Sequence, residues 1–289
     1  YAVIRDTDVT FLALPTPSEA DGSIDLSIME AGAESLAEAL GQKSDRHTVV
    51  VKSTVVPGTT EDVIGGILEQ VEGNELGENV GLGMNPEFLR EGSAVQDFLE
   101  PDKVVLGWEA DWVGDIMEAV FEPLIAESDP AVRNTGIREA EFIKYANNTF
   151  LAAKVSLINE LGNIAKDFGV DSYEVANAIG LDHRISEHFL RSGVGWGGSC
   201  FPKDVDAIRA AAREVSYEPA LIDAVVEVNE KQPQRMLDLL SNRFEISGSR
   251  VAVLGLSFKP HTDDIRNSRA IPIIEGLQER DAEVVAYDP

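Results

Sequence analysis

The sequence predicts an α/β protein with a mostly parallel sheet, a helical middle section and the opening of a second α/β unit. Short apolar runs alternate with helical stretches in the first section, a pattern typical of a parallel sheet. Apolar residues then recur at helical spacing from residue 136 to residue 168, which predicts one long helix. Strand and helix patterns return after residue 243. We therefore expect three domains, over residues 1–135, 136–230 and 231–289.

Each section has its own set of expected elements. Apolar runs predict buried parallel strands at 9–14, 48–51, 80–84 and 104–107. Helices are expected at 26–40, with Asp25 or Ser27 as the cap, and at 59–71 after a Pro-Gly pair. The long helix is expected to end at Gly169, and shorter helices follow at 171–179, 203–214 and 219–231. The last section is expected to hold a strand at 250–254, a helix at 270–280 and a strand at 283–287.

The chain carries 51 acidic against 24 basic residues, a formal net charge of −27. The acids are dispersed, which favours a halophilic protein whose self-repulsion is screened by salt; an acidic protein of ordinary cytosol is the alternative. This charge argues against nucleic acid as a partner. No apolar run is long enough to span a membrane, and no secretory leader opens the chain. A single cysteine allows no internal disulfide, so we expect a cytoplasmic protein.

Cys200 is the only cysteine and follows a pair of glycines in the segment 197–200. Glycines let the backbone pass close to a neighbour, and Pro202 fits the first turn of a helix that starts here. The start of a helix favours a thiolate, because the helix dipole is positive there. A lone cysteine is more often an inert apolar residue. This setting nevertheless favours a nucleophile, with Asp204 one helical turn further on.

Polar and turn residues follow three of the predicted strands, at the edge where parallel sheets bind ligands. They are residues 14–17, residues 52–54 and the carboxylates Glu87 and Glu91. Lys144 and Asn148 are four apart on the long helix, so they project from one face and could offer two donors to an oxyanion or phosphate. A lysine on such a helix is more often a solvated surface residue. The pair alone therefore leaves both interpretations open.

Seven segments resemble, in order along the chain, the UDP-glucose and GDP-mannose 6-dehydrogenase family of nucleotide-sugar enzymes. They are Leu-Pro-Thr-Pro at 14–17, Lys-Ser-Thr at 52–54, Asn-Pro-Glu-Phe-Leu-Arg-Glu-Gly at 85–92, and segments 144–148, 182–185, 197–204 and 258–268. The spacing from Lys144 to Cys200 also matches that family. The resemblance implies a Rossmann-like NAD-binding domain without its first βαβ unit, a central all-α domain with a long helix, and the start of a second Rossmann-like domain. It also implies a homodimer joined through the central helix.

The activity that the resemblance implies is a four-electron oxidation of C6 of the sugar, from alcohol to carboxylate, with NAD as the cofactor. Cys200 would attack the bound aldehyde, and a second hydride transfer would turn the thiohemiacetal into a thioester that water hydrolyses. The other implied catalytic residues are Lys144 and Asn148 for the oxyanions, Asp204 with Thr54 for the hydroxyl proton, and Glu87 for hydrolysis. Implied cofactor contacts are Pro15, Thr16, Thr54, Glu91 and Arg266. Implied substrate contacts are Phe88, Leu89, Arg90, Lys144, Asn148, Arg184 (across the dimer interface), Trp196, Gly197, Phe258 and Lys259.

The motifs resemble the UDP-glucose branch most, which implies UDP-glucuronate as the product, for surface polysaccharides. GDP-mannose remains the alternative substrate, whereas UDP-N-acetylhexosamine enzymes depart from the pattern at 88–90. One feature of the family is missing: a strand that leads into Gly-x-Gly-x-x-Gly, with an acidic residue about 20 positions later. We therefore expect these 289 residues to be part of a longer enzyme and to bind NAD weakly by themselves.

Two other classes of protein remain possible from the sequence. A module that binds a UDP-sugar without converting it would have no need of Cys200, Lys144, Asn148 and Asp204 together. A hydroxyacid or phosphogluconate-type dehydrogenase shares the helical middle domain but has no use for a thiol nucleophile. A metal site is not expected, because the four histidines show no ligand spacing with Cys200.

Overall fold

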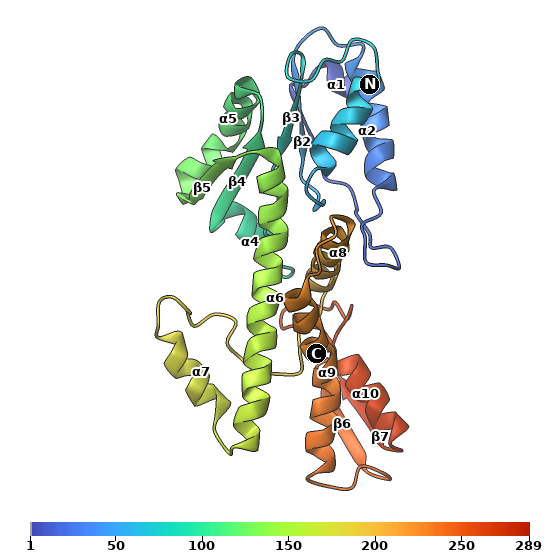
Figure 1. Ribbon diagram of the computed structural model, residues 1–289, viewed down its shortest axis with the longest axis vertical. Coiled ribbons are helices and arrows are strands. Elements are labelled where there is room, and N and C mark those ends of the chain that lie inside the picture. The colour runs from blue at the N-terminus through green and yellow to red at the C-terminus, as the bar shows by residue number, and fades with distance from the viewer. Residues whose placement is uncertain (1) are drawn as a thin grey trace. The chain divides into compact units, whose positions relative to one another are not determined.

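The computed structural model describes residues 2–289. They form two compact units that divide between Ala146 and Asn147, within the long helix α6 (Ile137–Asp167). Unit 1 is the part up to Ala146, and unit 2 is the part from Asn147 onward. Figure 1 shows that unit 1 contains the larger sheet and unit 2 the smaller one.

The sheet of unit 1 has five strands in sequence order, with parallel pairs β1–β2, β2–β3 and β4–β5. The strands are β1 (Val9–Leu12), β2 (His47–Val51), β3 (Val80–Met84), β4 (Lys103–Trp108) and β5 (Ala131–Thr135). The four predicted strands are therefore confirmed in position. Strand β5 was not expected, because its sequence contains no apolar run. The structure shows why none is needed, since four of its five residues are exposed.

The prediction that all four strands are parallel is wrong for β4. It pairs antiparallel with β3, with Gly83 opposite Trp108 and Met84 opposite Gly107. A parallel connection needs a crossover that packs on the sheet, usually a helix. The segment between β3 and β4 holds only the short helix α4 (Ala94–Leu99), which has no buried residue. The chain therefore turns back instead of crossing over.

Helices cover both faces of the larger sheet, which explains why all five residues of β2 are buried. Successive residues of a strand point to opposite faces. Val49 and Val51 pack with α2 (Ser27–Leu40), η1 (Thr59–Gly65), α3 (Gly66–Glu69) and the start of α6, whereas Val50 packs with α5 (Asp111–Ser128). A short helix α1 (Ala2–Arg5) precedes β1. The sheet thus exposes mainly its edges and strand ends to ligands.

The two helices predicted in unit 1 are confirmed in place. The side chain of Asp25 accepts a hydrogen bond from the Ser27 N–H (2.8 Å) at the start of α2, so Asp25 rather than Ser27 provides the side-chain acceptor. The helix predicted at 59–71 begins as the seven-residue π-helix η1 and continues as α3. It follows Gly58, whose φ of 96° is a left-handed conformation that glycine adopts readily.

Unit 2 packs three helices around the second half of α6. They are α7 (Ser172–Gly180), α8 (Cys200–Glu214) and α9 (Ala220–Ser241). The parallel pair β6 (Arg250–Leu254) and β7 (Glu283–Tyr287) and the helix α10 (Ala270–Glu279) complete it. Helix α9 runs ten residues past its predicted end at Lys231 and includes Pro233. Its added turns pack Leu237 against Ile273 and Leu277 of α10, and this burial outweighs the cost of the proline.

The fold class is thus confirmed as α/β with a mostly parallel sheet, a long helix and the start of a second α/β unit. Across residues 2–289, none of the helices combines the length and the apolar character that a membrane crossing requires.

Candidate active site

Lys144 lies on the second turn of α6 and is buried, with 3% of its side chain exposed. Its Nζ is 2.9 Å from Glu87 Oε1, in the loop that follows β3. The other carboxylate oxygen of Glu87 accepts the Leu89 N–H at 2.6 Å, which fixes the carboxylate within its own loop. The interpretation of Lys144 as a solvated surface residue is therefore wrong. The Lys144 ammonium has three N–H donors, so it can donate to another acceptor beside Glu87.

Two more lysines lie beside this pair in unit 1. Burial lowers the pKa of Lys52 to about 8, with Glu87 opposing the shift and Lys144 adding to it. Its Nζ donates to Asn85 Oδ1 at 2.6 Å. Lys103 Nζ lies 4.2 Å from the centre of the Phe88 ring, and burial lowers the pKa of Lys103 as well. The end of β3 is therefore a local positive region in a strongly acidic chain.

The ends of β1 and β2 are tied together by hydroxyl groups. Thr16 Oγ1 donates to the carbonyl oxygen of Thr54 at 3.1 Å, and Ser53 Oγ donates to that of Leu14 at 2.6 Å. Thr54 is buried, with 9% of its surface exposed. The strand-end residues singled out from the sequence therefore do gather at one edge of the sheet.

Arg90 and Glu91 follow in the loop after β3. Arg90 is exposed and forms a bidentate pair with Asp97 on α4, with Nη2 2.6 Å from Oδ1. The Arg90 hydrogen bonds lower the pKa of Asp97 to about 2. This pair braces the loop that carries Glu87 and Phe88. Glu91 is half-buried in the same loop.

In unit 2, Cys200 is the first residue of α8 and is exposed, so the prediction that it lies at a helix start is confirmed. The two glycines before it do bring the backbone close to a neighbour. A Cβ at position 197 would lie 2.1 Å from the carbonyl oxygen of Asn267, and one at 198 would lie 2.7 Å from the Phe258 ring. The cysteine loop therefore packs directly on the segment 258–268. An inert core cysteine is excluded by its exposure.

Asp204 and Asn148 form a buried polar pair one turn from Cys200 along α8. Asn148 Nδ2 donates to Asp204 Oδ2 at 2.6 Å, with 5% and 1% of the two residues exposed. Lys203 Nζ lies 2.8 Å from Asp204 Oδ1 as an ion pair without hydrogen-bond geometry. Asp204 Oδ1 is thus a buried acceptor that has no hydrogen bond from the described residues. Beside the Lys203 ion pair, this oxygen keeps the capacity to accept a hydrogen bond.

Several residues that hold the glycine-rich loop 193–198 were missed from the sequence. Asn229, fully buried on α9, accepts the Trp196 N–H at 2.7 Å and donates to the Trp196 carbonyl at 3.0 Å. Arg269 Nε donates to the same carbonyl at 2.8 Å, and Ser156 Oγ accepts the indole N–H at 3.0 Å. None of these residues belongs to a recognisable motif. The loop before Cys200 is thus fixed by contacts that local sequence does not reveal.

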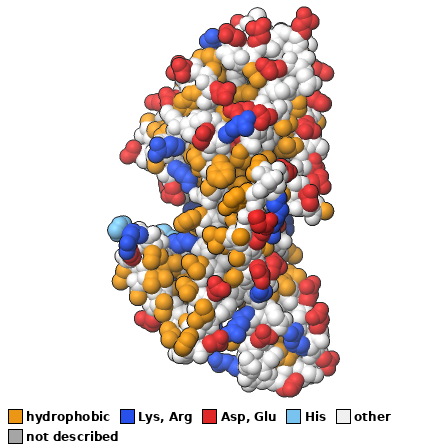
Figure 2. All heavy atoms as spheres, viewed as in Figure 1, with side chains coloured by type: hydrophobic (Ala, Val, Ile, Leu, Met, Phe, Trp, Pro, Cys, Tyr) orange, Lys and Arg blue, Asp and Glu red, His pale blue; other side chains and the backbone are white. Residues whose placement is uncertain are grey.

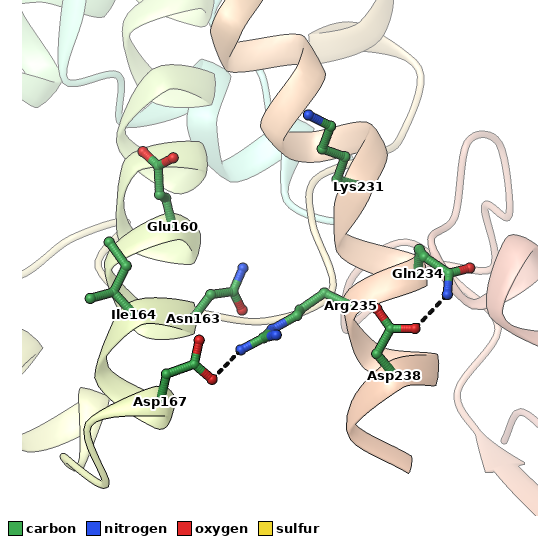
Figure 3. A pocket seen from close by; sticks show the side chains of 8 residues that line it. All are labelled: Glu160, Asn163, Ile164, Asp167, Lys231, Gln234, Arg235 and Asp238. Carbon is green, nitrogen blue, oxygen red and sulfur yellow. Dashed lines mark hydrogen bonds and ion pairs between the residues drawn. The ribbon is translucent and has the colours of Figure 1, made fainter. Parts of the chain in front are cut away.

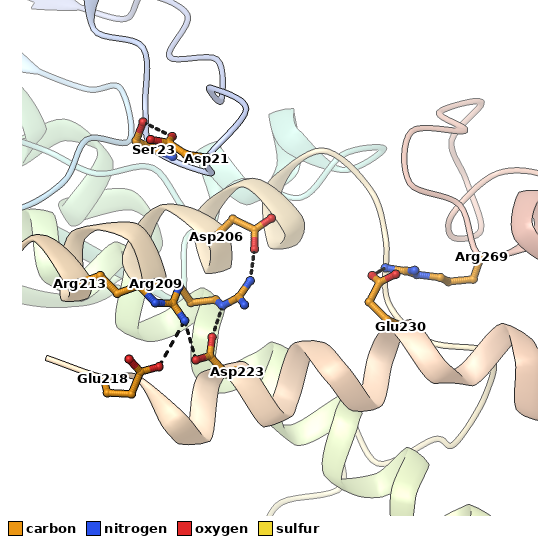
Figure 4. Close-up of polar contacts among 9 residues, drawn as sticks. All are labelled: Asp21, Ser23, Asp206, Arg209, Arg213, Glu218, Asp223, Glu230 and Arg269. Atoms are coloured by element: carbon orange, nitrogen blue, oxygen red, sulfur yellow. Dashed lines mark hydrogen bonds and ion pairs between the residues drawn. The ribbon is translucent and has the colours of Figure 1, made fainter.

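Ion pairs also fix α8 to α9. Arg209 on α8 bridges Asp206 (2.7 Å) and Asp223 of α9 (2.6 Å), and Arg213 pairs with the same Asp223 at 2.6 Å (Figure 4). The Arg269–Glu230 pair at 2.8 Å is drawn in the same view. The two arginine pairs with Asp223 therefore join α8, whose first residue is Cys200, to α9.

Two predicted binding arginines bond aspartates of their own loops. Arg184 Nη2 is 2.6 Å from Asp182, and Arg266 Nη2 is 2.7 Å from Asp264. Their contacts with substrate and cofactor stay predictions. Lys259 Nζ lies 5.6 Å from the Phe258 ring centre. Unit 1 holds Pro15, Thr16, Thr54, Glu87, Phe88, Leu89, Arg90, Glu91 and Lys144, and unit 2 holds Asn148, Arg184, Trp196, Gly197, Cys200, Asp204, Phe258, Lys259 and Arg266.

A separate pocket of unit 2 contains none of these residues. It lies between α6 and α9, has a volume of about 430 Å³, and is lined by mixed charges that include an Arg235–Asp167 pair at 2.6 Å (Figure 3). Lys231 pairs with Glu227 outside the lining, and the Gln234 amide donates to Asp238 at 2.6 Å. The lining contains no cysteine, serine or threonine that could act as a nucleophile. No group of three or more potential metal ligands occurs among residues 2–289.

Comparison with known proteins gives matches along nearly the whole chain. Residues 2–125 match the NAD binding domain, residues 138–231 the central domain and residues 252–289 the UDP binding domain of the UDP-glucose/GDP-mannose dehydrogenase family. The UDP-glucose 6-dehydrogenase AglM of Haloferax volcanii is 60% identical over 100% of this chain and 67% of its own. The GDP-mannose 6-dehydrogenase of Pseudomonas aeruginosa is 39% identical over 99% of this chain and 64% of its own.

Among solved structures, a UDP-glucose dehydrogenase from Pyrobaculum islandicum superposes with a TM-score of 0.91. The two sequences are 42% identical. The match includes 100% of this chain and 65% of the Pyrobaculum chain. The chain thus spans about two thirds of the length of the proteins it matches. The strand-end residues, the loop at 85–92 and the thiol at the start of α8 therefore lie on a shared fold, and this chain belongs to the UDP-glucose/GDP-mannose dehydrogenase family.

Proposed function

We propose that the full-length gene product oxidises UDP-glucose to UDP-glucuronate with NAD⁺, by way of covalent intermediates on Cys200. The observation that carries this proposal is an exposed thiol on the first residue of α8, one turn before a buried carboxylate whose Oδ1 has no hydrogen-bond partner among the described residues. Such a thiol can hold an aldehyde between two oxidation steps, which a hydroxyl would do poorly. Asp204 can accept a proton through a water molecule.

The residues of unit 1 fit a dinucleotide. Strands β1, β2 and β3 are parallel, and their carboxyl ends carry Thr16, Thr54 and the Glu87 loop, the edge at which doubly wound sheets bind such ligands. We assign cofactor contacts to Pro15, Thr16, Thr54 and Glu91 of unit 1, and to Arg266 of unit 2. When bound, NAD⁺ accepts one hydride from C6 in each of the two oxidation steps.

The chain's own residues then have the following roles in the first oxidation. Asp204, with Thr54 and a water molecule, takes the proton of the C6 hydroxyl as hydride leaves C6, and the alcohol becomes an aldehyde. The Cys200 thiolate adds to that aldehyde, so a C6–S bond forms while the carbonyl oxygen gains charge. Lys144 and Asn148, on consecutive turns of α6, stabilise this oxyanion.

The second half of the reaction releases the product. The thiohemiacetal loses its hydroxyl proton and a second hydride, which leaves a thioester on Cys200. Glu87 assists a water molecule that attacks C6, the C–S bond breaks, and the carboxylate departs from the regenerated thiolate. One alcohol, two NAD⁺ and one water thus become one carboxylate, two NADH and three protons.

Substrate contacts are assigned to both units: Phe88, Leu89, Arg90, Lys144, Asn148, Arg184, Trp196, Gly197, Phe258 and Lys259. The 60% identity with a protein named as a UDP-glucose 6-dehydrogenase favours that substrate over GDP-mannose, whose named dehydrogenase is 39% identical. The product suits the synthesis of surface polysaccharides.

A homodimer and a halophilic, cytoplasmic setting complete the proposal. Large apolar side chains are exposed along one face of α6, at Phe150, Leu157, Leu161 and Ile164, and Phe168 directly after the helix is exposed as well. A stripe of this kind on a helix is suited to pairing with a second copy. Acidic side chains are spread over the visible surface rather than gathered in one patch (Figure 2), which supports a protein adapted to high salt.

The test measures NADH formation by the full-length gene product in high salt, with UDP-glucose and GDP-mannose in parallel, for the wild type and Cys200→Ser. We expect two NADH per UDP-glucose for the wild type and loss of turnover in the variant. Activity with GDP-mannose alone would assign the protein to the other branch. Tight binding of UDP-glucose without NADH would instead favour a non-catalytic binding module.

A further inference from the structure

The first two turns of α6 hold two different strand-end loops of unit 1. Glu141 Oε2 accepts the Gly58 N–H at 2.6 Å, and Oε1 accepts the Thr60 N–H at 2.8 Å. Three residues later on the same helix, Lys144 pairs with Glu87 at 2.9 Å. One helix thus binds the loop after β2 through an acid and the loop after β3 through a base.

A third polar contact joins the two loops to each other. Lys52 at the end of β2 donates to Asn85 at the end of β3 (2.6 Å), and the Asn85 amide donates to the Val105 carbonyl at 2.8 Å. Asn85 is buried, with 2% of its surface exposed. The helix and the two loops therefore form a closed ring, in which each pair of members shares a polar contact.

The Glu141 contact requires the burial of a carboxylate, which carries a larger desolvation cost than a serine or threonine helix cap. The carboxylate has no exposed surface, and burial raises the pKa of Glu141 while the Thr60 and Gly58 N–H groups lower it. A serine or threonine within the loop could satisfy the same N–H groups at a smaller desolvation cost. A carboxylate that reaches in from another element also fixes the distance between helix and loop. It already occupies the N–H groups at the start of η1, where an anion would otherwise bind.

We propose that Glu141 is a positioning residue, which fixes the loop 52–60 and its Thr54 against the turn of α6 that carries Lys144. The inference rests on the function proposed above, in which Thr54 and Lys144 act on the same carbon. Glu141 itself touches neither substrate nor cofactor in this account. Lys52 supports the same geometry from the other side of the ring.

The variant Glu141→Gln tests this role at nearly constant volume. A glutamine side chain offers one acceptor oxygen, so one of the two N–H groups must face an NH₂ donor and the loop must shift. A displacement near 1 Å at a catalytic group can cost on the order of 10²-fold in rate. We therefore expect kcat to fall at least about tenfold. KM for the nucleotide sugar should stay within about twofold, because the loop 52–60 that is released carries none of the assigned substrate contacts.

Asn74 offers a matched control in unit 1. Its buried amide donates to the carbonyls of Ala37 (3.0 Å) and Leu68 (2.9 Å), which ties α2 to α3. Asn74→Ala removes two buried hydrogen bonds to backbone, as Glu141→Gln disturbs two, but it leaves the ring intact. We expect it to lower the melting temperature and to keep the wild-type kcat. Both variants are assayed as the full-length gene product at the same interval below their own melting temperatures.

Glu141→Asp retains a carboxylate on a side chain that is one methylene shorter. It allows the proposal to be tested even if Glu141→Gln fails to fold. We expect it to fold and to have a kcat between those of the wild type and Glu141→Gln. Wild-type kcat in a folded Glu141 variant, or an equal loss of kcat in Asn74→Ala, would overturn the positioning role alone. A wild type that forms no NADH with any nucleotide sugar would overturn the proposed function, and this role with it.

Discussion

Replacing Gly197 by alanine should disturb substrate binding through one backbone contact. The added Cβ would lie 2.1 Å from the Asn267 carbonyl oxygen, where ordinary contact begins at 3.4 Å, so one of the two segments must move by about 1.3 Å. The obstacle is backbone and cannot rotate away. Overpacking of this kind costs about 1–3 kcal/mol. Because Phe258 and Lys259 belong to the displaced segment, we expect the Kd for UDP-glucose to rise about tenfold, the equivalent of 1.4 kcal/mol.

The assay is calorimetric titration of UDP-glucose into the full-length protein, together with thermal unfolding. The melting temperature should fall by roughly 2–10 °C for a loss of that size. Gly193→Ala is the matched control, because it lies in the same loop and its Cβ would have no heavy atom within 4 Å. We expect the control to keep wild-type affinity and stability. Unchanged affinity in Gly197→Ala, or equal losses in both variants, would refute the reasoning.

Three further predictions concern Asp204, His47 and the net charge of the chain. Asp204→Asn should lower kcat by about 10²-fold or more with little change in KM, because the amide can still accept the Asn148 hydrogen bond but cannot take up a proton. Steady-state kinetics measure both constants, and an unchanged kcat would contradict this prediction. Burial lowers the pKa of His47 below 6.5, so the unfolded chain binds the proton first and stability is lost as pH falls below 6.5. His47→Gln should therefore flatten the fall of the melting temperature on acidification, and an unchanged slope would exclude His47 as its source. The melting temperature should also rise between about 0.1 M and about 2 M NaCl as the charge of −27 is screened, and full stability and activity at the lower salt would contradict halophilic adaptation.

Local sequence patterns were sufficient to place most of the elements. β2 and β3 are apolar runs buried by helices on both faces, and a run of that kind gives a clear signal. β5 is exposed and polar, so it gave none. The antiparallel direction of β4 depends on how the loop 85–102 packs, and the spacing of apolar residues in the sequence carries no information about that packing. Helix α9 continued through Pro233 because contacts with α10 outweigh local propensity.

The candidate site divides in the same way. Cys200, Asp204 and Glu87 stand in local motifs and could be named from the sequence. Glu141 and Asn229 act through partners 83 and 33 residues away, so their roles appear only when the chain is folded. The burial of Lys144 also needed the structure, because helical spacing alone could not distinguish a surface lysine from one paired with Glu87.

The central claim is that the sugar is held as an acyl group on Cys200, and mass spectrometry can test it directly. Full-length Glu87→Gln should hydrolyse the thioester slowly, so a sample quenched in acid during turnover with UDP-glucose and NAD⁺ should carry the acyl adduct on the peptide that contains Cys200. The wild type should show less adduct, and Cys200→Ala none. An active enzyme without the adduct in any sample, together with two NADH per sugar from Cys200→Ala, would contradict the account.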